Sequence, residues 1–386
     1  MSFDSLASKI YSIYKDKESI PLHEPFFNKT DKDFINDCID SSYVSSNGKF
    51  LTKLEESISS FTGAKYVNLF VNGTSALHLA LLASGLKQDQ EVISQSLTFV
   101  ATLNAISYIG AKTVLIDIER KSLGIDPMRL KEWLEQNTVM KNDECINLSS
   151  GNKIHACVPM HTFGIPSKIE EIVDICNNKN ILVIEDCAES MGSFLNEKHT
   201  GLFGSAGVLS FNGNKLITTG GGGAIITNDA DFSNKLRHIG TTAKVNHEYE
   251  FIHNEIGYNY RMPNINAALG CAQITRINSY LQSKREIFDM YADFFSHYEH
   301  ANIITTEENV KSNNWLITVL YDSNKKRDED LNNLLKSKIF ARIPWRPMHL
   351  LGIHNIELDT NLDNTEYLYK HALNLPSSPY LKEHKK

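Results

Sequence analysis

The sequence has few cysteines, and they are not grouped. Its six cysteines are scattered along 386 residues, with no C-x-x-C pair and no cluster of Cys and His. Structural zinc sites and disulfide-stapled domains both require such spacing. We therefore expect neither a metal nor a disulfide framework. The cysteines are Cys38, Cys145, Cys157, Cys176, Cys187 and Cys271.

The chain also lacks a long apolar run and a basic tract. No stretch approaches the roughly 18 apolar residues that a membrane-spanning helix needs. The N-terminus carries Asp4 and Asp16 and has no hydrophobic segment of the kind found in signal peptides. The formal net charge of −7 argues against nucleic acid as a partner. These absences predict a soluble cytoplasmic protein that binds neither nucleic acid nor membrane.

Short apolar segments alternate with helical patterns from about residue 20 to 255. This alternation predicts an α/β fold, with a mostly parallel central sheet and helices on both faces. The polar stretch 137–153 is expected to be an exposed loop or turn pair. The expected strands are 66–71, 91–94, 112–117, 154–160, 181–186, 207–211 and 224–227.

The pattern changes after about residue 256. A long helix is expected from Ile265 to Arg285, followed by a strand over 314–321 and a helix over 328–337. Because the chain is long for one domain, this change is interpreted as the start of a second, smaller α+β domain.

The N-terminal residues have the spacing of a short amphipathic helix, with apolar Leu6, Ile10 and Ile13 on one face. We expect this helix to pack on the body of the protein or on a partner subunit. The predicted division is therefore an N-terminal helix over 1–19, a large domain over 20–255 and a small domain over 256–386.

A single lysine, Lys215, stands between two predicted strands in the stretch GVLSFNGNKLITTGGGGAIITN, residues 207–228. A lysine in a loop is usually a solvated cation. Lysine is, however, one of the few side chains that form a Schiff base with a carbonyl, including that of pyridoxal phosphate. Glycines on both sides let a flat ring approach the backbone closely. The stretch therefore indicates a cofactor-binding lysine.

An upstream strand supplies a carboxylate that such a cofactor needs. The apolar run 181–184 ends in Glu185 and Asp186, at the carboxyl edge of a predicted parallel strand. A carboxylate beside the pyridinium nitrogen keeps it protonated, and Asp186 is the candidate. The alternative is that Asp186 only caps the next helix.

A second upstream segment offers a phosphate site. Gly73, Thr74 and Ser75 follow a strand and open an apolar helix over 76–83, so their free N–H groups can form a cup for an anion. Ser210, five residues before the lysine, can add a hydroxyl to the same phosphate. A capped core helix is the alternative for this segment taken alone.

The phosphate cup, the strand-end Asp, the serine and the lysine occur in one order along the chain. In this arrangement the sequence resembles the DegT/DnrJ/EryC1/StrS sugar aminotransferases, which are fold-type I pyridoxal phosphate enzymes. The matching segments cover most of the chain. They are NGTSALHLAL (72–81), SLTFVATLNAISYIGA (96–111), DIERKSLGID (117–126), PMHTFG (159–164), IEDCAESMGS (184–193), SFNGNKLITTGGGGAIITND (210–229) and GYNYRMPNINAALGCAQ (257–273).

The resemblance implies roles for further cofactor-binding residues. Phe99, in LTF, falls where relatives place an aromatic ring that stacks on the cofactor. Glu189, in EDCAES, falls near the cofactor's phenolic oxygen. Asn259, in GYNYR, resembles the asparagine that reaches the phosphate of the neighbouring subunit, which implies a homodimer with shared active sites.

The resemblance also implies residues near the substrate. His161, in PMHTFG, is expected close to the site as a positioning group. Arg342, Trp345 and His349, in ARIPWRPMH, correspond to a segment near the sugar nucleotide. An Arg can bind a phosphate or carboxylate through two hydrogen bonds.

Two N-terminal segments narrow the resemblance. IYSIYKDKESIPLHEPFF (10–27) and SSYVSSNGKF (41–50) are similar to the branch that aminates nucleotide-linked 4-keto-6-deoxy N-acetylhexosamines, of legionaminic acid or bacillosamine type. This implies transamination from L-glutamate to the 4-keto carbon of a sugar on UDP or GDP. An enzyme of GDP-perosamine or dTDP-amino sugar type, and a non-catalytic regulator that keeps the fold, are the alternatives.

Two other enzyme classes fit less well. Sugar dehydratases of the same family carry His where this chain has Lys215. A Rossmann oxidoreductase needs its glycines at the start of a helix, whereas the four glycines here precede a strand.

Overall fold

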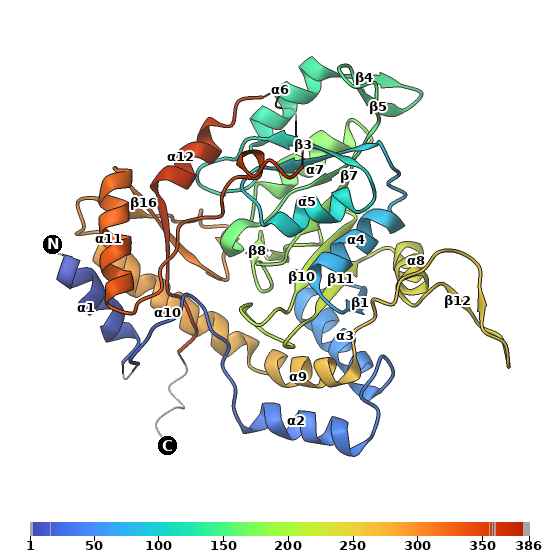
Figure 1. Cartoon of the computed structure of the whole chain (residues 1–386), viewed down its shortest axis with the longest axis horizontal. Coiled ribbons are helices and arrows are strands. Elements are labelled where there is room, and N and C mark those ends of the chain that lie inside the picture. The colour runs from blue at the N-terminus through green and yellow to red at the C-terminus, as the bar shows by residue number, and fades with distance from the viewer. Residues whose placement is uncertain (1–2, 16, 355, 357, 359, 381–386) are drawn as a thin grey trace.

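The centre of the protein is a seven-stranded sheet in the order β1-β11-β10-β7-β6-β2-β3 (Figure 1). The computed structural model describes residues 3–15, 17–354, 356, 358 and 360–380. All seven strands of this sheet are those predicted from the sequence. They are β1 (Tyr66–Phe70), β2 (Glu91–Gln95), β3 (Lys112–Ile116), β6 (Ile154–Val158), β7 (Leu182–Asp186), β10 (Ala206–Ser210) and β11 (Gly223–Thr227).

The sheet is mostly parallel, as predicted. Neighbouring strands from β3 through β2, β6 and β7 to β10 are parallel, and β11 lies antiparallel between β10 and β1. The carboxyl ends of the parallel strands therefore meet at one edge, where ligands bind in open α/β sheets. Asp186 ends β7 and Ser210 ends β10 at this edge.

Alternate strand residues pack on opposite faces of the sheet, as the two-residue repeat of a strand requires. Ile184 and Val208 belong to the hydrophobic cluster under α4, α5 and α8, whereas Val183 and Leu209 belong to clusters on the other face, under α6, α7, α3 and α9. The helices are α3 (Lys49–Thr62), α4 (Gly73–Ala83), α5 (Val100–Ser107), α6 (Pro127–Asn137), α7 (Ile169–Asn177), α8 (Ala230–Gly240) and α9 (Asn264–Ile274). Both faces are covered, which confirms the α/β prediction.

The C-terminal part contains its own three-stranded antiparallel sheet, in the order β14-β16-β17. The helix α1 (Phe3–Ile13) packs here, and its predicted apolar residues Leu6, Ile10 and Ile13 are all buried against this sheet and α10. Residues 1, 2 and 16 of the predicted helix lie outside the described residues. The remaining elements of this part are α10 (Ile277–Phe295), α11 (Asn324–Lys336), α12 (Asp363–His371), β14 (Ala301–Ile303), β16 (Ile317–Tyr321) and β17 (Ala372–Leu375).

The long helix predicted from Ile265 to Arg285 is wrong, because the chain forms two helices there, α9 and α10. The break falls at Thr275 and Arg276. Arg276 leaves the helical path and donates two hydrogen bonds to the carboxylate of Asp31, at 2.7 and 2.8 Å. This buried ion pair lets α9 pack on α2 (Lys29–Asp40) and α3 while α10 turns toward the C-terminal sheet.

The polar stretch predicted as an exposed loop or turn pair forms a β-hairpin of β4 (Thr138–Lys141) and β5 (Glu144–Asn147). Asn142 and Asp143 form its turn with φ of 50° and 61°, values that Asn and Asp tolerate better than most residues. The other short elements are β8 (Phe194–Leu195), β9 (Lys198–His199), β12 (Lys244–Val245), β13 (Ile252–His253), β15 (Val310–Lys311) and the 3-10 turns Thr162–Gly164 and Met348–Leu350.

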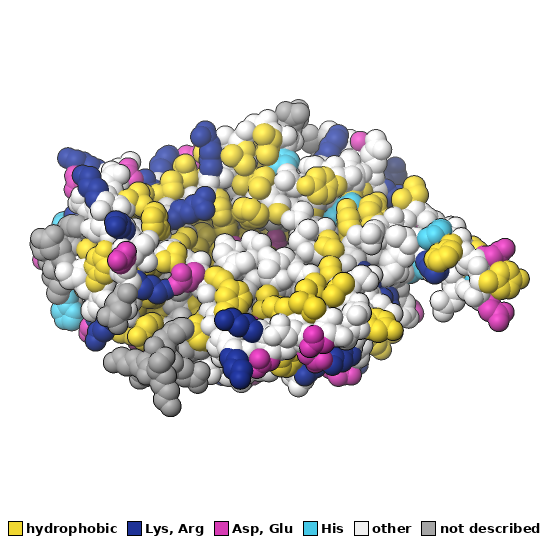
Figure 2. Space-filling model, turned by 60° about the horizontal axis from the view of Figure 1, so that its bottom comes forward, with side chains coloured by type: hydrophobic (Ala, Val, Ile, Leu, Met, Phe, Trp, Pro, Cys, Tyr) yellow, Lys and Arg dark blue, Asp and Glu magenta, His cyan; other side chains and the backbone are white. Residues whose placement is uncertain are grey.

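An arm, residues 244–256, extends from the body beside α8 (Figure 1). Figure 2 shows hydrophobic and acidic side chains at its tip. Tyr249 and Phe251 are each 79% exposed, and Ile256 is 85% exposed. Across the described ranges, no helix combines the length and the apolarity that crossing a membrane requires.

Candidate active site

A cavity of about 480 Å³ lies at the carboxyl edge of the central sheet and brings together residues from both parts of the chain. Its lining includes most of the residues singled out in the sequence. The predicted residues that line it are Gly73, Thr74, Phe99, Asp186, Glu189, Ser210, Lys215, Arg342 and Trp345.

Lys215 lies in the loop between β10 and β11, as predicted, and its side chain is only 13% exposed. The Nζ atom is 3.2 Å from Oε1 of Glu189. It also lies 4.0 Å from the ring centre of Trp315, over the face of the indole. The amine therefore has a carboxylate and an aromatic face as neighbours, and both favour a cation.

Glu189 is buried beside this amine. Burial raises the pKa of the Glu189 carboxyl to about 7, although the nearby Lys215 ammonium acts to lower it. Oε2 of Glu189 accepts a hydrogen bond of 2.9 Å from the backbone N–H of Phe163. Phe163 has a φ of 57° and a ψ of 17°, an uncommon conformation for a residue other than glycine. No local pattern in the sequence indicates this contact. Near neutral pH, the Glu189 carboxyl can therefore be either protonated or ionised beside the lysine.

Asp186 presents its carboxylate to the cavity from the end of β7. Oδ2 accepts a hydrogen bond of 2.7 Å from Oγ1 of Thr102, in the first turn of α5, and Oδ1 accepts one of 3.1 Å from the N–H of Ala188. Each oxygen keeps lone pairs free, since a carboxylate has about four acceptor positions. The carboxylate is thus oriented and still able to accept a hydrogen bond from a pyridinium N–H.

The N-terminus of α4 and Ser210 form a small cup at one end of the cavity. Asn72 caps the helix by accepting a hydrogen bond of 2.7 Å from the N–H of Ser75. This leaves the N–H groups of Gly73 and Thr74 for an anion, and Ser75 does not line the cavity. A side chain at Gly73 would crowd Ser210, because a Cβ there would lie 3.0 Å from the Ser210 Cβ.

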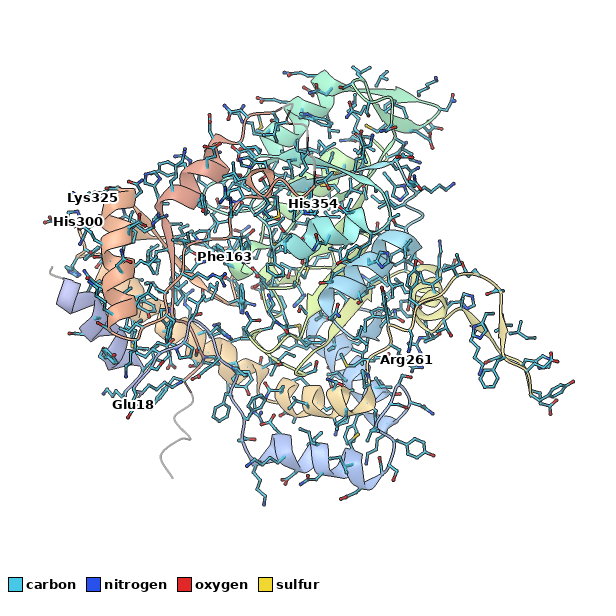
Figure 3. All side chains as sticks on the ribbon, viewed as in Figure 1. Glu18, Phe163, Arg261, His300, Lys325 and His354 are labelled. Atoms are coloured by element: carbon cyan, nitrogen blue, oxygen red, sulfur yellow. The ribbon has the colours of Figure 1, made fainter. Side chains whose placement is uncertain are left out.

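Aromatic side chains form another wall of the cavity. Phe99 is 48% exposed, and its ring centre is 6.0 Å from that of Trp345. Trp345 also contacts Phe163, labelled near the middle of Figure 3, at 4.8 Å between ring centres. The backbone of Arg342 is fixed by two hydrogen bonds to Asn374, at 3.0 and 2.7 Å. The wall offers apolar surface and one cation.

Three other predicted site residues do not line the cavity. His349 hydrogen-bonds to Oγ of Ser96 at 2.7 Å. Asn259 is exposed on the segment that follows the arm and pairs with Thr241, so it does not contribute to the cavity of its own chain. His161 is fully buried, and only its backbone N–H contacts Asp186, by a hydrogen bond of 3.1 Å to the carbonyl oxygen.

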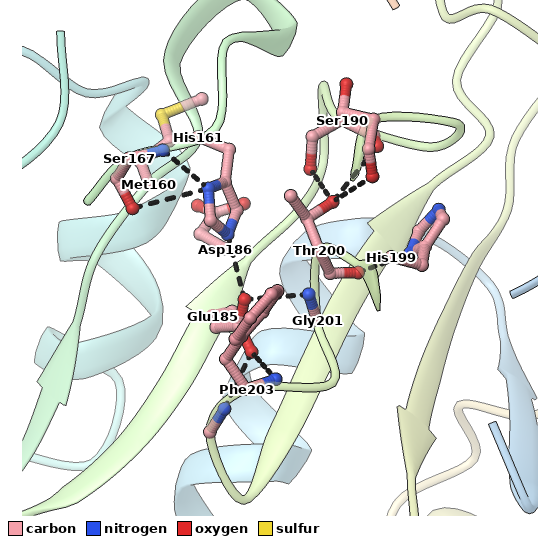
Figure 4. Close-up of polar contacts among 12 residues, drawn as sticks. Met160, His161, Ser167, Glu185, Asp186, Ser190, His199, Thr200, Gly201 and Phe203 are labelled. Atoms are coloured by element: carbon pink, nitrogen blue, oxygen red, sulfur yellow. Dashed lines mark hydrogen bonds and ion pairs between the residues drawn. The ribbon is translucent and has the colours of Figure 1, made fainter. Parts of the chain in front are cut away.

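The His161 side chain belongs to a buried network around Glu185 (Figure 4). His161 Nε2 lies 3.0 Å from Oε2 of Glu185, and Cys187 completes a group of three residues with metal-ligand atoms. The Glu185 oxygens already accept hydrogen bonds from three backbone N–H groups, those of Gly201, Phe203 and Gly204, at 2.7 to 2.8 Å. A carboxylate with all four acceptor positions used fits a structural role, supporting the end of β7 next to Asp186.

Thr102 and Trp315 are cavity residues that the sequence did not reveal. Thr102 lies in the helix VATLNAIS, which also contains Asn104 and Ser107, so the sequence does not single it out. Trp315 follows two asparagines in NNW (313–315), and nothing in that pattern indicates a lysine contact.

Comparison with known proteins places this site in a family. Residues 26–386 match the model of the DegT/DnrJ/EryC1/StrS aminotransferase family. The chain belongs to this family. It is 34% identical over 367 residues to the GDP-perosamine synthase of Escherichia coli O157:H7, a match that covers 94% of both sequences. It is 28% identical over 339 residues to the UDP-4-amino-4,6-dideoxy-N-acetyl-beta-L-altrosamine transaminase of Campylobacter jejuni, covering 86% of both.

A solved structure agrees with this assignment. The aminotransferase PseC of Helicobacter pylori, described as involved in the biosynthesis of pseudoaminic acid, is 25% identical, with a TM-score of 0.83 over 93% of both chains. The fold is thus that of fold-type I aminotransferases, and this aminotransferase depends on pyridoxal phosphate. Because the chain belongs to this aminotransferase family, the comparisons support neither a Rossmann oxidoreductase nor a non-catalytic regulator. The cavity fits the cofactor, because it combines a lysine, an oriented carboxylate and a free helix N-terminus.

Proposed function

We propose that this aminotransferase moves an amino group from L-glutamate to the 4-keto carbon of a nucleotide-linked 4-keto-6-deoxy sugar. The favoured substrate is a 2-acetamido-2,6-dideoxy-hexos-4-ulose on UDP or GDP, and the product is the 4-amino sugar on the same nucleotide. The observation that carries the proposal is the meeting of Lys215, Asp186 and the N-terminus of α4 in one cavity. A cytoplasmic location fits such a substrate and is proposed with it.

The relatives support the substrate class. The Campylobacter jejuni relative is named for a UDP-linked 4-amino-4,6-dideoxy-N-acetyl sugar, and the Escherichia coli relative for GDP-perosamine. The name of the Escherichia coli relative makes a GDP-perosamine type of substrate the next candidate. The N-terminal segments 10–27 and 41–50 are the reason for placing the N-acetylated sugar first.

We assign the cofactor contacts to the residues that form the cavity. Lys215 would hold pyridoxal phosphate, Asp186 its ring nitrogen, and Ser210 with the α4 N-terminus its phosphate. Phe99 offers a ring for stacking. When bound, pyridoxal phosphate supplies an electron sink that makes the hydrogen on the amino-bearing carbon acidic.

The protein then has to move that proton. The Lys215 amine would accept this proton from the glutamate carbon and donate it to the cofactor, and in the second half-reaction it would carry a proton from the cofactor to the sugar carbon. Glu189, with its pKa near 7, lies 3.2 Å away and can share the lysine proton between these steps. Arg342 and Trp345 line the cavity and would bind the sugar nucleotide, an anion that carries an aromatic base.

We further propose a homodimer with shared sites. A phosphate needs more donors than Gly73, Thr74 and Ser210 provide. Asn259 is exposed and lies outside its own cavity, as a residue that serves the neighbouring subunit would. The arm beside it exposes large apolar side chains, which suits burial against a second copy.

The test is a substrate panel. Purified protein loaded with pyridoxal phosphate is incubated with L-glutamate and UDP- or GDP-linked 4-keto-6-deoxy sugars, each with and without the 2-acetamido group. We expect a mass change of one amino group replacing one keto oxygen, fastest with an N-acetylated sugar. Lys215→Ala is the matched control. If only the GDP sugar that lacks the acetamido group is converted, the second candidate is supported. If none of the four sugars gives a product, both candidates are refuted.

A further inference from the structure

Trp315 links the C-terminal part of the chain to the lysine loop at two points. The face of its indole lies 4.0 Å from Nζ of Lys215. Its Nε1 donates a hydrogen bond of 2.7 Å to the carbonyl oxygen of Asn214, the residue before the lysine. One side chain therefore contacts both the reactive end of Lys215 and the backbone that carries it.

The position of Trp315 does not depend on the lysine. Its backbone N–H donates to Oδ1 of Asn313 at 2.8 Å, and its carbonyl oxygen accepts from Oγ of Ser377 at 2.6 Å. The indole is 5% exposed and packs in a hydrophobic cluster with Phe163 and Leu368. A rigid aromatic platform is thus built beside a flexible side chain.

The same segment holds the other neighbour of the amine. Nδ2 of Asn313 donates to the carbonyl oxygens of Glu189 and Met191, at 2.8 and 2.9 Å. Glu189 and Trp315 are therefore fixed relative to each other, and the Lys215 amine lies between the carboxylate and the ring. A lysine side chain has many rotamers, so contacts on two sides restrict where its amine can go.

We propose that Trp315 is a positioning residue for transamination, which keeps the Lys215 amine against Glu189 while the amine accepts and returns a proton. This proposal rests on the proposed function. The ring face attracts the ammonium form, and the N–H holds the loop. Proton transfer depends steeply on such placement, because the reacting atoms must stay within about 3 to 3.5 Å. Trp315 itself exchanges no proton with the substrate.

Two variants separate the two contacts. Trp315→Phe keeps a ring face and loses the N–H, whereas Trp315→Leu loses both. Trp133→Phe is the matched control, since Trp133 is also buried and its Nε1 has no hydrogen-bond partner among the described residues. For Trp315→Leu we expect proton transfer to slow roughly 10-fold or more, as the loss of a desolvated cation–π contact implies. The rate of proton transfer in Trp315→Phe should lie between the rates of Trp315→Leu and the wild type.

The first readout is the rate of the half-reaction with L-glutamate, compared with the rate for α-deuterated L-glutamate. The cofactor's absorbance is recorded during a single turnover. In Trp315→Leu the isotope effect should increase while the concentration of L-glutamate giving half-maximal rate stays within about twofold, because only the proton step has slowed. Trp133→Phe should match the wild type.

The second readout uses the cofactor-free protein and needs no reaction. A small amine-acylating reagent is applied briefly, and modification of Lys215 is measured by peptide mass spectrometry against that of exposed lysines. Lys215 should be modified several-fold faster in Trp315→Leu than in the wild type or Trp133→Phe, because the amine loses its ring contact. The proposal is overturned if, in Trp315→Leu, Lys215 is labelled at the wild-type rate and the isotope effect is unchanged, even if that variant unfolds at a lower temperature. If the wild type does not react with L-glutamate, the proposed donor is wrong. The labelling result alone then tests whether Trp315 positions the Lys215 amine.

Discussion

Oγ1 of Thr102 donates a hydrogen bond of 2.7 Å to Oδ2 of Asp186, and so joins the first turn of α5 to the end of β7. Thr102 is itself fully buried, and its hydroxyl lies 2.8 Å from that of Thr98. The carboxylate therefore has a fixed direction into the cavity. This orientation matters if Asp186 keeps the cofactor's ring nitrogen protonated, as we propose.

Asp186→Asn should keep the fold and some cofactor, while turnover falls by roughly 100-fold or more because a neutral amide cannot hold the pyridinium proton. Thr102→Val should cost less, about 10-fold, since it removes one hydrogen bond to a charged group. Thr138→Val is a matched control, because its buried hydroxyl donates to the Leu134 carbonyl on α6 and does not line the cavity. Near-normal turnover by Asp186→Asn would assign the role to another carboxylate.

The raised pKa of Glu189 predicts that the stability of the protein depends on pH. Burial raises its pKa to about 7, so the folded protein holds a proton there that the unfolded chain releases at lower pH. The stability contributed is present at acidic pH and is lost as the pH rises through 7. Relative to Glu189→Gln, the cofactor-free wild type should lose up to about 3 kcal/mol of unfolding free energy between pH 5 and 8.

Urea denaturation of both proteins at several pH values measures this difference. Glu307→Gln, at an exposed carboxylate outside the cavity, provides the control and should follow the wild type. A wild type and Glu189→Gln whose unfolding free energies run parallel from pH 5 to 8 would show that the Glu189 pKa is not raised.

The strands and the central site residues could be predicted because their signals are local. The run that ends in Asp186 is apolar over a strand's length, and Lys215 stands among glycines within a few residues. Local composition also indicated an anion cup at Gly73, Thr74 and Ser75, and the first two of these residues line the cavity. The resemblance to a known family added Phe99 and Glu189, which no local pattern distinguished from core residues.

Features that depend on distant partners could not be predicted. The break between α9 and α10 is set by Arg276 binding Asp31, 245 residues away, and the sequence around it continues a helical pattern. Trp315 bonds to Asn214 across 101 residues. His161, expected close to the site as a positioning group, does not line the cavity, because its side chain contacts Glu185 in the buried network.

The shared-site proposal predicts complementation between two inactive chains. Asn259→Ala lacks the donated asparagine, and Lys215→Ala lacks the lysine. In a heterodimer, one site combines the intact Lys215 of the first chain with the intact Asn259 of the second. With random exchange of subunits in a symmetric dimer, an equal mixture should recover roughly a quarter of wild-type activity.

Exchange of subunits in that mixture is checked by pull-down of differently tagged chains. Asn228→Ala, a loop asparagine outside the cavity, is the control and should remain active by itself. A mixture that exchanges subunits and stays inactive, while Asn259→Ala alone is severely impaired, would mean that Asn259 serves its own subunit.

The account rests most heavily on Lys215 as the residue that holds pyridoxal phosphate, because its amine faces Glu189 and Trp315 within the cavity. The direct measurement is borohydride reduction of the loaded protein, followed by peptide mass spectrometry. We predict that the cofactor's mass is found on the peptide containing Lys215 and is absent from Lys215→Ala, which should still fold. Cofactor fixed to another lysine, or fixed equally well to Lys215→Ala, would contradict the assignment of the site.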